Sequence, residues 1–222
     1  MLAVPTHPTA GRMVQVGPER LQRWLEGFAD RHGAATWEAS PETVTLHAGD
    51  GARAELTVPF PPLPPQPEAP YGGVVAHALA PRCVGVLLVR LGGHAAGVFD
   101  GATLRTSKVG SRQVHGRSSA GGWSQQRFAR RREGQVRVAL ASAADVAVRV
   151  LLPVVDGLDA VVTGGDRRAL ETVLDDRRLQ RLRPLVSPVR LDVPDPRLSV
   201  LQATPAQFRA VQVRIVDAPG PV

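Results

Sequence analysis

Two patterns of apolar residues mark the first part of the chain. Over residues 18–33 they recur at the spacing of a helix, as Leu21, Trp24, Leu25 and Phe28, and a glycine follows as a stop signal. Three short runs that favour strands come next, bounded by turn residues, over 36–40, 43–48 and 53–60. We therefore predict a small α+β part over residues 1–58.

Proline interrupts both patterns after residue 58. Seven prolines lie between positions 59 and 70, and proline fits neither the interior of a helix nor a central strand. We interpret residues 59–70 as an extended connector. The alternative is a ligand for a proline-binding domain.

The remainder, residues 71–222, alternates between strand and helix patterns. The run at 158–165 is apolar almost throughout, as in a strand covered on both faces. The order predicts an α/β domain, with a mixed sheet flanked by helices. Its expected elements are strands 83–91, 95–101 and 103–117, a helix from Ser124, a second helix over 143–157, strand 158–165, helix 167–185, strand 187–195 and helix 205–216.

Composition narrows the setting of the chain. No continuous apolar run approaches the roughly 18 to 20 residues of a membrane-spanning helix, and residues 1–13 lack the basic start and apolar core of a signal peptide. We therefore expect a cytoplasmic protein with no membrane partner. The single cysteine, Cys83, lies within an apolar strand pattern, and we predict that it is a small buried hydrophobic residue.

Charge is distributed unevenly along the chain, whose formal net charge is +7. Residues 105–132 hold eight basic side chains and no acidic one, whereas residues 1–70 hold five arginines and eight carboxylates. Guanidinium groups bind phosphate oxygens in pairs, so we predict that the basic segment binds RNA and that the N-terminal part is not the main RNA-binding surface. The eight basic residues are Arg105, Lys108, Arg112, Arg117, Arg127, Arg130, Arg131 and Arg132.

The segment GGWSQQRFARRRE, residues 121–133, carries a motif. It resembles the Gly-Gly-Gln-Ser-x-x-Arg-Phe-x-Arg motif of the middle, peptidyl-tRNA-hydrolysing domain of eukaryotic and archaeal class I release factors. The resemblance covers about residues 82–216 and implies the RNase H-like fold of that domain. The matching residues are Gly121, Gly122, Ser124, Arg127, Phe128, Ala129 and Arg130.

One position departs from this motif. Trp123 stands where the release factors have their catalytic glutamine, and glutamines follow at 125 and 126. The chain is in this respect similar to the Vms-like release factors, above all the actinobacterial ones, which are ribosome quality-control peptidyl-tRNA hydrolases that keep the glycine pair and displace the glutamine. The resemblance implies release of a stalled nascent chain without a stop codon. The implied partners are the large ribosomal subunit and peptidyl-tRNA.

The residues themselves limit the chemistry. From residue 101 to 132 there is no Asp, Glu or Cys and one histidine, His115, so a conventional hydrolase triad lacks its members. A neutral glutamine amide and loop N–H groups can position water and stabilise an oxyanion, if the ribosome and tRNA supply the other contacts. Hydrolysis without a general base from this segment is therefore the chemistry to test.

We predict that Gln125 or Gln126 acts beside Gly121 and Gly122. Gln125 is favoured because it is nearer the glycines. If a helix begins at Ser124, consecutive residues point about 100° apart, so only one of the two glutamines faces the ester. Trp123 and Ser124 are expected to contact RNA together with the basic residues.

The competing hypothesis is a non-catalytic rRNA-binding or tRNA-binding protein, because a basic glycine-rich loop can bind RNA without chemistry. The histidines other than His115 show no ligand spacing, so we expect neither a metal nor a cofactor. We expect the chain to act as a monomer.

Overall fold

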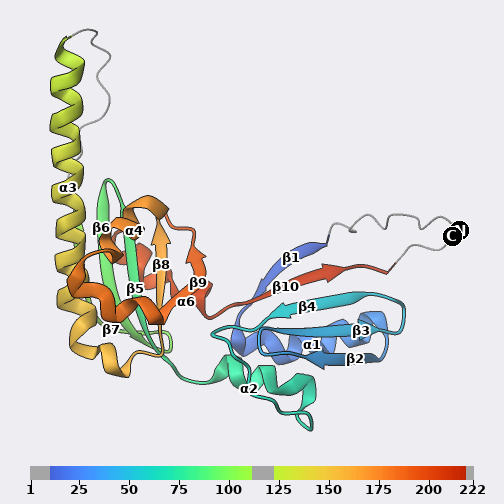
Figure 1. Ribbon diagram of the computed structural model, residues 1–222. Helices are drawn as coiled ribbons and strands as arrows, with labels where there is room; N and C mark the ends of the chain where they lie inside the picture. The colour runs from blue at the N-terminus through green and yellow to red at the C-terminus, as the bar shows by residue number, and fades with distance from the viewer. Residues whose placement is uncertain (1–10, 112–122, 219–222) are drawn as a thin grey trace, which may run out of the picture. The chain divides into compact units, whose positions relative to one another are not determined.

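The computed structural model describes residues 11–111 and 123–218, with side chains from 123 to 132 excepted. The chain forms two compact units, one made of residues 1–80 and 209–222 and the other of residues 81–208 (Figure 1). Each unit has one five-stranded sheet and its own helices. The predicted mixed α/β class, with flanking helices, is confirmed.

The first unit packs a helix on an antiparallel sheet of order β1-β10-β4-β3-β2. Helix α1 buries Leu21, Leu25 and Phe28 against the sheet, and it ends where Gly33 takes a positive φ of 84°. The helix and three strands predicted for this part are confirmed, whereas β1 and α2 were not predicted. The elements are β1 (Arg12–Val16), α1 (Pro18–His32), β2 (Ala35–Ala39), β3 (Thr43–Ala48), β4 (Arg53–Thr57), η1 (Pro70–Gly73), α2 (Val74–Leu79) and β10 (Val211–Val216).

The proline-rich segment 59–70 packs on the first unit. It has no strand or α-helix, as expected. Leu63 is only 3% exposed, its N–H donates to the Pro41 carbonyl at 2.8 Å, and His77 Nε2 lies 2.9 Å from the Pro59 carbonyl oxygen. Because these bonds fasten the segment to its own unit, the boundary between the units lies at residue 80 rather than within the prolines.

The C-terminal segment also departs from expectation. Instead of a helix over 205–216, the chain forms the four-residue helix α6 (Pro205–Phe208) and then strand β10. Apolar Val211, Val213 and Ile215 are buried, alternating with more exposed Gln212 and Arg214, which is the two-residue period of a strand. β10 lies between β1 and β4 in the first unit, so the domain expected over residues 71–222 divides differently.

This pairing predicts how fragments behave. A fragment of residues 71–222 keeps β10 but loses both of its neighbouring strands, so it exposes an apolar strand with two free edges. We expect it to associate, whereas a fragment of residues 81–208 stays monomeric and unfolds in one transition. Light scattering and thermal unfolding followed by circular dichroism compare the two. Equal solubility and equal unfolding midpoints would contradict this division of the chain.

The second unit has helices on both faces of a mixed sheet of order β7-β6-β5-β8-β9. β5 pairs antiparallel with β6 and parallel with β8. The predicted hairpins and the buried strand at 158–165 are confirmed. The elements are β5 (Cys83–Arg90), β6 (Gly93–Asp100), β7 (Thr103–Ser111), α3 (Trp123–Leu151), η2 (Leu152–Gly157), β8 (Ala160–Gly165), α4 (Arg167–Leu174), η3 (Arg177–Leu185), β9 (Val186–Leu191), α5 (Leu198–Ala203) and α6.

Alternate residues of the central strands supply two cores. Leu87 of β5 and Ala96 of β6 pack with α3, α4 and η3. On the opposite face, the Leu201 side chain of α5 lies against Gly97, and the ring of Phe99 meets that of Phe208 edge-on at 5.7 Å. A strand covered on both faces is apolar at every position, which explains the continuous apolar pattern of β5.

Helix α3 is one continuous helix of 29 residues, where two helices were expected. Gly134 lies inside it, and an isolated glycine costs a helix only about 1 kcal/mol relative to alanine. At a rise of 1.5 Å per residue, α3 is about 43 Å long, whereas an eight-residue strand spans about 26 Å. Its N-terminal part therefore extends beyond the strands, as Figure 1 shows.

Residues 133–157, which include most of α3 and all of η2, are long and apolar enough to span a membrane by length and composition, and 44% of the 18-residue apolar window within them is buried. The absence of a continuous apolar run did not reveal this helix, because Ser142, Asp145 and Arg149 interrupt the apolar sequence within residues 138–155. The same composition suits a helix packed in a protein core. Ala143, Ala147 and Leu151 belong to the core of the second unit.

Two further expectations need correction in this unit. The helix predicted over 167–185 is broken into α4 and η3, because Asp176 caps η3 by accepting a hydrogen bond from the Arg178 N–H. Cys83, predicted to be buried, is partly exposed at the start of β5. Partial burial, helped by the carboxylates of Asp159 and Asp100, raises the pKa of its thiol.

Candidate functional site

The segment that carries the predicted site lies between strand β7 and helix α3 in the sequence. Residues 112–122, with Gly121, Gly122, Arg112 and Arg117, lie outside the described part of the structure, as does the strand position expected for His115. α3 begins at Trp123, which agrees with the helix start predicted near Ser124. Its first turn therefore contains the backbone of both Gln125 and Gln126, and its first ten residues also include Arg127, Arg130, Arg131 and Arg132.

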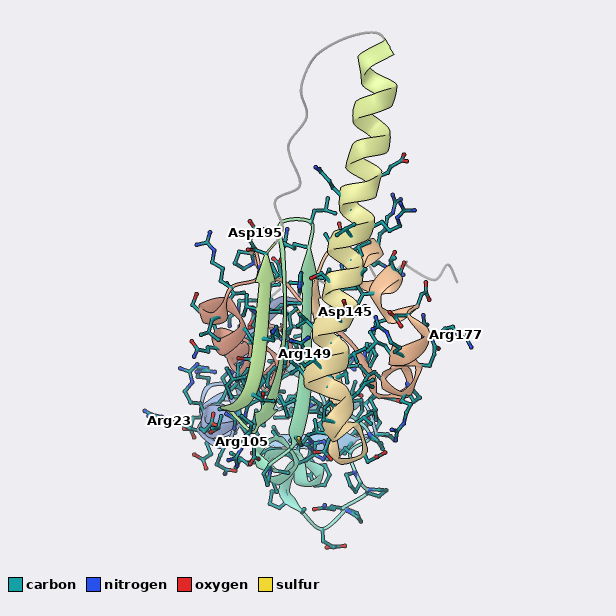
Figure 2. The ribbon with its side chains drawn as sticks, turned by 90° about the vertical axis from the view of Figure 1, so that its left-hand side faces the viewer. Arg23, Arg105, Asp145, Arg149, Arg177 and Asp195 are labelled. Atoms are coloured by element: carbon teal, nitrogen blue, oxygen red, sulfur yellow. The ribbon has the colours of Figure 1, made fainter. Side chains whose placement is uncertain are left out.

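The two basic residues of β7 differ in their surroundings. Arg105 lies near the start of the strand, and its guanidinium donates to the Asp100 carboxylate, which raises the pKa of Arg105. At about 3.3 Å per residue, six residues separate it from Ser111 by about 20 Å, and Figure 2 shows Arg105 near the lower end of the sheet. Lys108 is exposed and three residues from the strand's end. Lys108 is therefore placed closer to the glycine pair along the chain.

The first turn of α3 contains no charged residue in its sequence. The N-terminal end of a helix carries a partial positive charge, which favours acidic residues there. The first turn of α3 has no acidic residue, and the first acidic residue of the helix is Glu133. An anion such as RNA phosphate would be favoured at this end of the helix.

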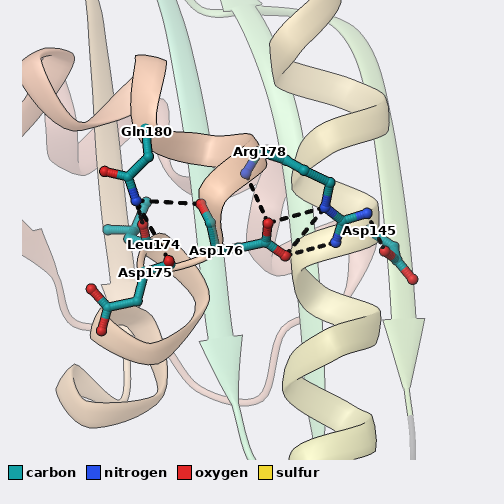
Figure 3. A network of polar contacts seen from close by, with 6 residues as sticks. All are labelled: Asp145, Leu174, Asp175, Asp176, Arg178 and Gln180. Carbon is teal, nitrogen blue, oxygen red and sulfur yellow. Dashed lines mark hydrogen bonds and ion pairs between the residues drawn. The ribbon is translucent and has the colours of Figure 1, made fainter.

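A salt-bridge network ties α3 to η3 on the flank of the unit (Figure 3). Arg178 donates from Nη1 to Asp145 of α3 at 2.9 Å and from Nη2 to Asp176 at 2.7 Å. The hydrogen bonds that Asp176 accepts from the side chain and the backbone N–H of Arg178 lower the pKa of Asp176 to about 2. The network links residues 33 positions apart. Sequence analysis did not single out Arg178, because several arginines lie close to it in the sequence and no local pattern distinguishes it from them.

The lowered pKa predicts how stability depends on pH. Asn at position 176 keeps the helix cap but removes the charge, so Asp176→Asn should lower the unfolding midpoint at neutral pH. Because the folded pKa of Asp176 lies below its unfolded value of about 3.9, the stabilisation is complete above pH 4 and is lost as the pH falls towards 2. Thermal unfolding from pH 7 to pH 2 measures the difference between parent and variant, which should shrink across that window.

Asp192→Asn is the matched control, because the Asp192 side chain is fully exposed and its nearest guanidinium is 3.9 Å away. A difference for Asp176→Asn that stays constant from pH 7 to pH 2, or one equal to that of the control, would contradict a role for the Asp176 charge.

No metal site emerges from the part of the chain that the structure covers: no group of three or more His, Cys, Asp or Glu side chains gathers there. The arrangement that remains is a basic segment between an edge strand and a long helix. Comparison with known proteins adds to this picture. A family model described as the Actinobacteria/chloroflexi VLRF1 release factor matches residues 82–214. The chain belongs to this family.

Membership in the VLRF1 family confirms the resemblance to Vms-like release factors. Among solved structures, the chain is similar to an archaeal translation termination factor, aRF1, at 16% identity and a TM-score of 0.44, covering 90% of this chain and 67% of that one. It is also similar to the Vms1 mitochondrial localization core, at 8% identity and a TM-score of 0.41, covering 91% and 82%. A search of the curated proteins finds no match.

Proposed function

We propose that this VLRF1 family member hydrolyses peptidyl-tRNA on stalled ribosomes or large subunits and so releases the nascent chain without a stop codon. The observation that carries the proposal is the family match over residues 82–214, which includes the glycine pair and the basic segment. Large-subunit rRNA and the tRNA acceptor end are the proposed partners. The chain would act as a monomer in the cytoplasm, where ribosomes are found.

The start of α3 supplies groups that suit ester hydrolysis. The first four N–H groups of a helix have no acceptor within it, and in α3 these include residues 123–125. Such groups stabilise an oxyanion when they are aimed at it. One glutamine amide would orient the attacking water, and the glycines would let the backbone approach RNA closely.

The basic residues would hold this turn against RNA. Each guanidinium or ammonium group that neutralises a phosphate releases counterions, so binding should weaken steeply with salt. The absence of carboxylates between residues 101 and 132 removes repulsion from the same surface. It also leaves the segment without a carboxylate base, so the ribosome would have to complete the site.

That missing base is the observation that favours the second candidate, a ribosome-binding protein without catalysis. A release assay separates the two. Stalled complexes carrying a labelled peptidyl-tRNA are mixed with the chain in the absence of puromycin, and free peptide and bound chain are measured together. Release at a rate that saturates with the chain supports hydrolysis, whereas saturable binding with no release supports the alternative.

A further inference from the structure

His94 combines burial with polarity beneath α3. It lies in β6 and is 3% exposed, and in the described part of the chain it is the only buried side chain that can ionise. Ala96 and Val98, the next residues on the same face of the strand, belong to the apolar core that packs with α3. A buried polar ring in such a core needs specific partners, so its contacts show which elements it joins.

The ring contacts both elements that lead to the site. His94 Nε2 is 3.5 Å from Oγ of Ser142 in α3. On the other side, His94 pairs with Gly110 of β7, and a Cβ at position 110 would lie 2.4 Å from Nε2. The imidazole thus occupies space that any other residue at position 110 would fill. The ring therefore lies between the end of β7 and the side of α3 that faces the sheet.

The position of this contact along α3 matters for the proposed chemistry. Gln125 is 17 residues from Ser142, which corresponds to about 25 Å along the helix axis. A change of about 5° in the direction of α3 at this contact would move Gln125 by about 2 Å. A misplacement of about 1 Å can cost a reaction about 10²-fold. The angle at which α3 leaves the sheet is therefore a property on which the site depends.

We propose that His94 is a positioning residue, which sets the direction of α3 through Ser142 and the register of β7 through Gly110, and so places the first turn of α3 for reaction. This inference rests on the proposed function. The proposed role of His94 is exerted through α3 and β7 and not by contact with the substrate. Its main effect falls on the release step after the ribosome is bound, because Arg130, Arg131 and Arg132 lie nearer Ser142 along α3 than Gln125 does and move less when the helix changes direction.

The test compares His94→Leu with His94→Gln. Leucine fills the space without a polar atom, whereas the glutamine amide places a nitrogen near the position of Nε2. We expect His94→Leu to lower the single-turnover release rate at saturating protein by about tenfold or more, with ribosome affinity within about twofold of the parent. His94→Gln should recover most of the rate. Ser142→Ala, a milder change, should lie between the parent and His94→Leu.

Thr204→Val is the matched control for lost stability. Thr204 is fully buried in the same unit but on the opposite face of the sheet, where its hydroxyl donates to the Leu201 carbonyl at 2.7 Å. It should lower the unfolding midpoint without lowering the release rate. Parental release by His94→Leu, or equal losses for His94→Leu and Thr204→Val, would overturn the proposal.

A distance measurement judges the inference separately from the proposed function. Spin labels are placed at Glu133→Cys in α3 and at Asp192→Cys beyond β9, both exposed, in a Cys83→Ser background. His94→Leu should broaden or shift the distance distribution between them, and His94→Gln should restore it. If His94→Leu leaves the distance distribution unchanged, the positioning role is contradicted even when the parent releases peptide. If the parent releases no peptide, the proposed function is contradicted, while the distance distributions still show whether His94 sets the direction of α3.

Discussion

Gln125→Ala is expected to lower the rate of peptide release by about 10² to 10³, the usual loss when one positioning or oxyanion contact is removed. The same expectation holds for Gln126→Ala if that glutamine faces the ester. Both lie in the first turn of α3, where consecutive residues are about 100° apart, so one variant should lose release and the other should not. The measurement is single-turnover release at saturating protein, with ribosome binding followed in parallel.

Gln135→Ala is the matched control, because it changes the same residue type in the same helix about 15 Å further along the axis. It should release at the parental rate. If Gln125→Ala and Gln126→Ala also release at that rate, side-chain glutamine chemistry is wrong, and only the backbone of the glycine pair and of the first turn of α3 would remain as the reacting surface.

Replacing Arg130, Arg131 and Arg132 by alanine is expected to weaken ribosome binding and to flatten its dependence on salt. Each lost phosphate contact lowers the slope of log affinity against log salt by roughly 0.7 to 0.9. Three contacts would therefore remove about 2 to 3 from the slope. Binding titrations at several salt concentrations give both quantities.

A triple variant at Arg149, Arg177 and Arg190 makes the same change in net charge at exposed positions elsewhere in the second unit. It should leave the salt slope close to the parental value. An unchanged slope for the first triple variant, or the same change for both, would place the RNA-binding surface elsewhere on the protein.

Local patterns predicted most of the strands because their apolar positions are set by the sheets they join. The β5 run is apolar throughout because the strand lies in the middle of its sheet and is buried on both faces. The alternation of buried Val211, Val213 and Ile215 with more exposed residues likewise indicates a strand. The prediction of a helix over 205–216 did not take this alternation into account. The pairing of this strand with β1 and β4 could not be predicted, because it joins the two ends of the chain.

The candidate site was predicted only as far as short motifs extend. The start of α3 followed from the sequence after the glycine pair, since helix starts have local signals. The contact of His94 with Gly110 and Ser142 depends on strand register and helix packing, and neither leaves a local signal. The same limit applies to Arg178, whose partner Asp145 lies in another helix.

The most direct test of the central claim is the chemistry of the released peptide. Stalled complexes with no stop codon in the decoding site are incubated with the chain in water enriched in ¹⁸O, and the peptide and tRNA are analysed by mass spectrometry. Hydrolysis of the ester predicts a peptide whose free C-terminal carboxylate carries one ¹⁸O atom, together with an intact deacylated tRNA. A peptide that stays on its tRNA while the chain is bound, or one released with nucleotides attached, would contradict the account.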